Sequence, residues 1–228
     1  MCFSATASFT ASALLTTMGL YSMRTALSKD KRCLPLAAVP MFFGIQQGLE
    51  GSVWLGLHGS DPMLVQAGTV GYLFFSHGFW PFWIPLAAFF IEQRPSMKRW
   101  LGGIVAIGLL FSLSLYLPML LYPNAFDAIV NQGSIDYQTH LIYDTLWPRD
   151  VSRFIYLTIV VLSMWLADRW GSRLFAGLSA LSLVVTYGAF NYAFVSVWCF
   201  FAAVLSLYIV YIIQSDEFLS CAVKRADG

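Results

Sequence analysis

The chain contains little charge. Asp, Glu, Lys and Arg make up 11% of its 228 residues, whereas 58% are hydrophobic and the mean hydropathy is +0.68. Soluble domains carry about 25% charged residues, so this composition excludes an ordinary soluble protein and indicates a protein of the lipid bilayer. The formal net charge of +1, without a basic cluster on one face, also argues against a nucleic-acid partner.

Sequence patterns for bound metals, disulfides and retinal are missing as well. The four cysteines have neither zinc-ribbon nor CxxC spacing, and no HExxH sequence is present. Nothing at the N-terminus is typical of a cleavable signal, because no basic flank precedes the first apolar run. The last apolar segment contains no lysine, so a retinal would have no residue for its Schiff base.

What the chain does contain is seven apolar segments close to the length that spans a bilayer, about 20 residues. They cover residues 5–23, 34–57, 64–91, 101–122, 151–166, 174–190 and 193–213. The sequence therefore predicts an all-α membrane protein, a seven-transmembrane-helix bundle that forms one polytopic domain over residues 1–228.

The basic residues predict how this bundle is oriented. Eleven of the thirteen Lys and Arg residues fall in loops and a tail that share one side, and only Arg149 and Arg153 fall on the other. Because cytoplasmic loops are enriched in Lys and Arg, we expect the N-terminus outside and the C-terminus in the cytoplasm. The connection 123–150 is then on the outer side. Its many apolar and aromatic residues are unlike a solvated linker, so we expect it to fold over the bundle as a lid.

The stretch FFGIQQGLEGSVWLGL, residues 42–57, combines an apolar background with polar side chains. At about 100° per residue, one face of a helix would carry Gln46, Gln47, Glu50 and Trp54. A carboxylate at membrane depth is energetically costly and by default marks a functional site. The neighbouring arc, where a second helix can approach closely, carries Gly44, Gly48 and Gly51.

A second polar patch lies in FFSHGFWPFWIP, residues 74–85. Ser76 and Trp80 share a helix face, with His77 at its edge. Pro81 cannot donate a hydrogen bond to the carbonyl of His77, so we expect a kink there. Counted from the cytoplasmic ends at about 1.5 Å per residue, Glu50 and His77 reach similar depths of about 24 and 22 Å. We therefore expect them to share one outward-facing pocket.

Three interpretations of this pocket remain open. The first is a site for a small ligand or ion from the outer side, lined by Gln46, Gln47, Glu50, Trp54, Ser76, His77 and Trp80. The second is a metal-dependent, hydrolase-like membrane enzyme in which Glu50 and His77 are also the catalytic candidates. It would hold a transition metal such as zinc, and its candidate ligands are Glu50, His77, Cys2, His140 and Asp144. The third is a structural or partner-binding subunit in which a protonated Glu50 only fixes helix packing.

Two further points stay open at the level of sequence. Removal of Met1 would give Cys2 a free amine beside its thiol, which makes a good chelate. The oligomeric state is not determined, and a homo-oligomer is compatible with the composition. The lipid bilayer is the one partner that the composition requires.

Three motifs, MCFSATASF, FGIQQGLEGSVW and FSHGFWPFWIPL, together resemble a family of uncharacterised bacterial integral membrane proteins of about this length. The resemblance covers most of the chain to the end of the third apolar segment. It implies a multi-pass protein of the bacterial inner (cytoplasmic) membrane and brings no known activity, substrate or cofactor. The design is also similar to that of seven-helix membrane hydrolases that hold zinc, but the chain lacks their paired-histidine motif.

Overall fold

The computed structural model describes residues 4–122, 125–189 and 193–215. The described part is mostly helical, in the order α1 (Ala5–Lys29), η1 (Lys31–Cys33), α2 (Leu34–Ala37), α3 (Val39–Gly59), α4 (Pro62–Leu73), π-helical η2 (Phe74–Phe79), α5 (Trp80–Ile91), α6 (Pro95–Leu121), β1 (Phe126–Asn131), β2 (Ser134–Thr139), η3 (Ile142–Thr145), α7 (Arg149–Leu166), α8 (Trp170–Ala189) and α9 (Phe194–Gln214).

Seven long helices result when α4, η2 and α5 are counted as one continuous helix and the four-residue α2 is set aside. Four of them are long and apolar enough to cross a membrane: Pro62–Ile91, Pro95–Leu121, Gly171–Ala189 and Phe194–Gln214. The seven helices occupy the segments that the sequence predicts. The predicted helix 34–57 is broken at Ala38 into α2 and α3, because Pro40 has no N–H to donate to Leu36 one turn earlier.

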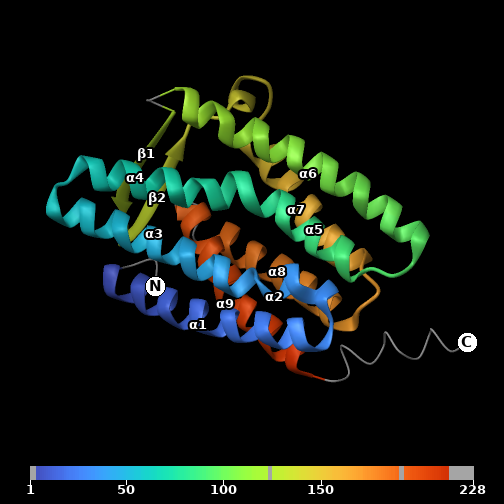
Figure 1. Ribbon diagram of the computed structural model, residues 1–228. Helices are drawn as coiled ribbons and strands as arrows, with labels where there is room; N and C mark the ends of the chain where they lie inside the picture. Colours follow the sequence, from blue (N-terminus) through green and yellow to red (C-terminus); the bar gives the residue numbers. More distant parts are fainter. Residues whose placement is uncertain (1–3, 123–124, 190–192, 216–228) are drawn as a thin grey trace, which may run out of the picture.

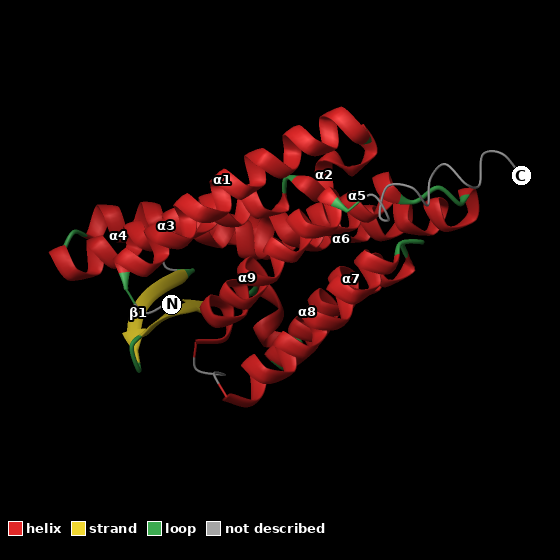
Figure 2. Ribbon diagram, turned by 90° about the horizontal axis from the view of Figure 1, so that it is seen from below, coloured by secondary structure: helices red, strands yellow, loops and turns green. Residues whose placement is uncertain are grey.

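The long helices lie side by side along one direction (Figure 1). The start of α1, the turn between α3 and α4, and the β-hairpin lie at one end, which we call the hairpin end. The connections that follow α1, α5 and α7 lie at the opposite end, the clasp end, as the second view also shows (Figure 2). Within the bundle, α3 packs against α1, α4 and α9. In this position between other helices, α3 buries Gln46, Gln47 and Glu50.

The glycine arc of α3 is the surface on which α1 packs. A Cβ atom added to Gly44 would overlap Thr16, and one added to Gly51 would press on the ring of Phe9. Gly48 faces Ser12 in the same way. The close helix approach expected for this arc is therefore present, and α1 is the partner.

The connection 123–150 contains a β-hairpin, so the expectation of an all-α fold is wrong for this segment. Strands β1 and β2 pair antiparallel, with Asn131 opposite Ser134. Only Gln132 and Gly133 form the turn, and both have positive φ values, 49° and 78°. Such a two-residue turn matches the right-handed twist of the strands. The hairpin packs on the bundle, and the ring of Tyr137 stacks on Tyr72 of α4 with 4.4 Å between their centroids.

The kink expected at Pro81 takes the form of a π-helical turn. Residues Phe74–Phe79 are π-helical, and the N–H of Trp80 donates to the carbonyl of Phe75, five residues earlier. The wider turn accommodates the break in the α-helical hydrogen-bond pattern that comes before the proline. Single π-helical turns inside α-helices are frequent at functional sites, and this one carries Ser76 and His77.

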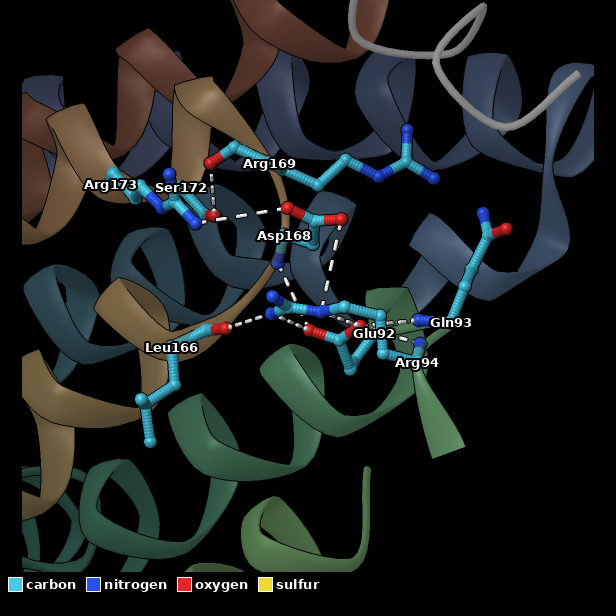
Figure 3. A network of polar contacts seen from close by, with 8 residues as sticks. All are labelled: Glu92, Gln93, Arg94, Leu166, Asp168, Arg169, Ser172 and Arg173. Carbon is cyan, nitrogen blue, oxygen red and sulfur yellow. Dashed lines mark hydrogen bonds and ion pairs between the residues drawn. The ribbon is translucent and has the colours of Figure 1, made fainter. Parts of the chain in front are cut away.

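A network of polar contacts joins two connections at the clasp end (Figure 3). The carboxylate of Glu92, whose side chain is fully buried, accepts hydrogen bonds from the backbone N–H groups of Gln93, Arg94 and Asp168 at 2.8, 2.7 and 3.0 Å. The Arg94 guanidinium donates to Glu92 at 2.9 and 3.1 Å and to the carbonyl of Leu166 at 2.7 Å. Glu92 therefore ties the α5–α6 connection to the α7–α8 connection.

Substitution of Glu92 should weaken this end of the bundle in a pH-dependent way. Burial opposes ionisation of Glu92, but the hydrogen bonds and charge of Arg94 outweigh it, and the pKa of Glu92 lies below its ordinary value. The stabilisation is therefore complete above the ordinary pKa and is lost as the pH falls through the lowered pKa of the folded state. At pH near 7, we expect Glu92→Gln to cost about 2 kcal/mol of unfolding free energy.

Thermal unfolding of the purified protein in detergent, at a series of pH values, measures this difference. The advantage of the wild type over Glu92→Gln should stay constant down to about pH 5 and shrink below about pH 4. A difference that does not change with pH would contradict an ionised Glu92 as its source.

Candidate functional site

The predicted polar face of α3 is buried inside the bundle. Gln46, Gln47 and Glu50 have no exposed surface. Glu50 Oε1 accepts a hydrogen bond from the Ser196 hydroxyl at 2.6 Å, and Oε2 accepts one from Gln47 Nε2 at 3.2 Å. Ser196 lies in the first turn of α9, so the Glu50 carboxyl group joins α3 to α9. We call these three residues, Gln47, Glu50 and Ser196, the Glu50 cluster.

Gln46 connects α3 to a different helix. Its Oε1 accepts a hydrogen bond from Trp80 Nε1 of α5 at 2.8 Å, and Phe43 stacks on the Trp80 ring with 4.0 Å between centroids. Trp54 is also buried, but its indole nitrogen has no hydrogen-bond partner among the described residues. Its backbone carbonyl lies 2.8 Å from His58 Nδ1.

His77 and Glu50 have different hydrogen-bond partners. His77 Nδ1 is 2.8 Å from the hydroxyl of Ser76, and the hydrogen-bond partners of Glu50 are Ser196 and Gln47 instead. No hydrogen bond joins His77 to Glu50 among the described residues. Counting residues along two helices gives the depth of each side chain, but it does not give the direction in which each helix turns that side chain.

Ser76 and His77 line a cavity of about 110 Å³ toward the hairpin end. Its wall combines residues from η2, α6, β2, α7, α8 and α9. The polar or ionisable side chains in the wall are Ser76, His77, Asp136, Tyr137, Thr139, Arg149, Ser152, Arg153, Tyr156 and Cys199. Cys199 also lies beside Gln46 and Tyr72, so α9 contacts both the polar face of α3 and the cavity.

Four of these wall residues come from the start of α7 and were not predicted as site residues. Arg149, Ser152, Arg153 and Tyr156 follow the spacing i, i+3, i+4, i+7, which places them on one helix face. That spacing is visible in the sequence, as is the separation of Arg149 and Arg153 from the other basic residues. No signal in the sequence singles out Ser196 and Cys199.

The two arginines also hold the segments that surround the cavity mouth. Arg149 donates from Nε and Nη2 to Asp144 at 3.1 and 3.0 Å, and its Nη2 also donates to the carbonyl of Thr139. Arg153 donates to Asp150 at 3.2 Å, and its guanidinium lies 4.4 Å from the ring centroid of Phe194. Burial opposes ionisation of Asp144, but its bonds to Arg149 and Leu141 outweigh it, and its pKa is lowered.

The remaining metal-ligand candidates do not gather around His77. The side chain of His140 is exposed and does not line the cavity, and Asp144 is bound to Arg149 and to the N–H of Leu141. Cys2 lies outside the described residues. Within the part of the chain that the structure describes, no three His, Cys, Asp or Glu side chains are grouped to hold a metal ion. The donor set seen here therefore does not fit a zinc site.

Comparisons with known proteins identify a family without assigning an activity. No curated protein and no solved structure matches the chain significantly. The model of a family of unknown function, DUF6629, matches residues 1–223, nearly the whole chain. This match confirms the uncharacterised family that the sequence motifs indicate, and the chain belongs to the DUF6629 family of unknown function.

Proposed function

We propose that this protein is a multi-pass membrane protein that binds a small ligand in an outward-facing cavity. The observation that carries the proposal is the cavity of about 110 Å³ with His77 and two arginines in its wall. Ligand sites are typically concave and mostly apolar, with a few convergent polar groups. The cavity has this character, because its polar groups converge among aromatic and aliphatic side chains.

The Glu50 cluster has a different part in this proposal. Both carboxyl oxygens of Glu50 have protein partners, and neither Glu50 nor Gln47 lines the cavity. A fully buried, satisfied hydrogen-bond group favours a role in fixing how α3 packs on α9. The ligand site is thus proposed at Ser76 and His77, and the predicted structural role at Glu50.

The proposal includes seven membrane spans with the hairpin end outside. Three of the long helices, α1, α3 and α7, are not among the four that are long and apolar enough to cross a membrane. For α3, burial of its polar side chains against neighbouring helices is compatible with a position inside a membrane bundle. Together with the family resemblance, this supports a location in the bacterial inner membrane.

The distribution of basic residues supports the orientation. Among the described residues, nine of the eleven Lys and Arg residues lie toward the clasp end: Arg24, Lys29, Lys31, Arg32, Arg94, Lys98, Arg99, Arg169 and Arg173. Only Arg149 and Arg153 lie toward the hairpin end. The positive-inside rule then assigns the clasp end to the cytoplasm.

Cysteine labelling in intact cells tests orientation and access together. In a background without the four native cysteines, a membrane-impermeant thiol reagent should modify Gln138→Cys on the exposed edge of β2 and Ser152→Cys in the cavity wall. It should modify Arg173→Cys at the clasp end only after permeabilisation. Labelling of Arg173→Cys in intact cells would overturn the orientation. Labelling of Gln138→Cys without Ser152→Cys would show that the cavity is closed to the outside.

A further inference from the structure

The cavity receives a concentrated positive charge from the start of α7. One face of α7 lines the cavity with four side chains: Arg149, Ser152, Arg153 and Tyr156. Arg149 and Arg153 are the only two basic residues that the described chain has at the hairpin end. Because basic residues are rare on this side, their convergence on one cavity needs an explanation.

Helix stability does not supply that explanation. The N-terminus of a helix carries a partial positive charge, so cations in the first turn are unfavourable there. Asp150 suits this position, but Arg149, the first residue of α7, opposes the helix dipole. Pro148 occupies the N-cap and provides no side-chain hydrogen bond to the first turn. The helix end and the guanidinium groups therefore add to one positive potential beside the cavity.

The acidic partners of the arginines neutralise this potential only in part. Asp144 and Asp150 pair with the two guanidinium groups, but neither residue lines the cavity. The bonds of Arg149 use Nε and Nη2, which leaves both N–H groups of Nη1 for another acceptor. One carboxylate does line the cavity, that of Asp136, so the wall contains two arginines and one acid.

The rest of the wall strengthens the field of these charges. It is built largely from aromatic and aliphatic side chains, among them Leu115, Leu183, Phe194 and Trp198. These apolar side chains lower the local dielectric constant, so charges in the cavity interact more strongly than they do at an open surface. A cavity of about 110 Å³ has room for several water molecules or for one small charged group.

We propose that the ligand of this cavity carries a phosphate or carboxylate group, bound by Arg149 and Arg153. The inference depends on the proposed function of the cavity and adds the chemistry of its ligand. The planar guanidinium matches oxyanions of this kind with paired N–H donors. The hydroxyls of Ser152 and Tyr156, on the same helix face, add donors that suit oxyanion oxygens. The group can belong to a free small anion or to a lipid headgroup.

Two reagents of opposite charge test the sign of the electrostatic potential in the cavity. Ser152→Cys is treated with anionic sulfonatoethyl methanethiosulfonate or with cationic trimethylammonioethyl methanethiosulfonate, and each rate is divided by that of Gln138→Cys. We expect the anionic reagent to be favoured by about tenfold at low salt. Adding Arg153→Gln should remove most of this preference, whereas adding Arg173→Gln at the clasp end should not.

Protection by phosphate tests binding without altering either arginine. For Ser152→Cys in dodecyl maltoside, inorganic phosphate should slow the modification several-fold relative to chloride at equal ionic strength. Slow modification in phosphatidylglycerol vesicles before phosphate is added, together with protection in detergent, would identify a lipid phosphate as the source. Fast modification in vesicles that slows on adding phosphate would identify a free anion.

The outcomes separate the two proposals. Equal normalised rates for both reagents, with no effect of phosphate in detergent, would overturn the oxyanion ligand while leaving an accessible cavity. No modification of Ser152→Cys by either reagent, with Gln138→Cys reacting normally, would overturn the open cavity itself. A preference for the cationic reagent would assign the cavity to a cation through Asp136.

Discussion

Glu50→Ala should be strongly destabilising, whereas Glu50→Gln should leave the protein folded. Alanine removes the acceptor for the Ser196 hydroxyl and for the Gln47 amide in a place without exposed surface. Each buried group left unsatisfied costs about 1 to 3 kcal/mol, and the space left by the side chain adds to this. We expect a total loss of about 3 to 5 kcal/mol in unfolding free energy.

The conservative substitution keeps the hydrogen bonds because of a feature of Gln47. Glutamine at position 50 would retain an acceptor for Ser196 but would present an amide NH₂ to Gln47. The Oε1 atom of Gln47 has no hydrogen-bond partner among the described residues, so the Gln47 amide can turn over and accept from that NH₂. The loss should then stay below about 1 kcal/mol.

Thermal unfolding in detergent, followed by size-exclusion chromatography of the surviving protein, compares the two variants. Ile45→Ala is the matched control, since Ile45 is a neighbour on α3 with 42% of its surface exposed, and its substitution should change little. If Glu50→Gln were as damaging as Glu50→Ala, the site would need a charged carboxylate. That outcome would revive the metal or cation interpretation.

A double-mutant cycle distinguishes the observed contact of Glu50 with Ser196 from the pairing with His77 that helix depth predicts. Glu50→Ala and Ser196→Ala remove two groups that are in contact, so their effects should be non-additive by about 0.5 to 3 kcal/mol. Glu50→Ala and His77→Ala should be additive within about 0.5 kcal/mol. A large coupling between Glu50 and His77 would place them in one site after all.

The long helices could be predicted because apolar length is a local property of the sequence. The ends of the helices were harder to predict from the sequence. The first apolar run stops near Met23, but α1 continues to Lys29 and ends only where Asp30 adopts an extended conformation and caps the next turn. Hydropathy marks the part of a helix that suits a bilayer, whereas capping chemistry marks where the helix stops.

The hairpin could not be recognised from its apolar content, which indicated only that the connection is ordered. The alternation of side chains along β2 is weak, since Ser134 and Ile135 are both buried although they point to opposite faces. The turn residues Gln132 and Gly133 differ from the Asn-Gly and Asp-Gly pairs that most strongly signal a two-residue turn. Packing on the bundle, including the stacking of Tyr137 on Tyr72, supports the strand pair.

The candidate site shows the limit of single-helix reasoning. The helical period correctly groups Gln46, Gln47 and Glu50 on one buried face of α3. The partner of Glu50 is Ser196, which lies 146 residues further along the chain. The packing of the whole bundle determines which helix faces this polar side of α3. The sequence of α3 alone does not predict it.

The contact between α5 and α6 leads to the second large expected effect, that of Gly108→Ala. Pro85 has no N–H, so it cannot donate the helical hydrogen bond to the carbonyl of Pro81 one turn earlier. That carbonyl oxygen faces Gly108 of α6, where a Cβ atom would overlap it severely. A side chain could move aside, but this obstacle is backbone. The two helices would therefore have to separate.

Gly103→Ala is the matched control on the same helix, because a Cβ atom at Gly103 meets no atom within 4 Å. Both substitutions gain up to about 1 kcal/mol of helix propensity. Only Gly108→Ala should be destabilised by overpacking, with a net loss of about 1 to 3 kcal/mol in unfolding free energy, measured by thermal unfolding. Because α6 and η2 both line the cavity, Gly108→Ala should also change the modification rate of Ser152→Cys. Equal stability of the two variants would show that α5 and α6 are not packed at this distance.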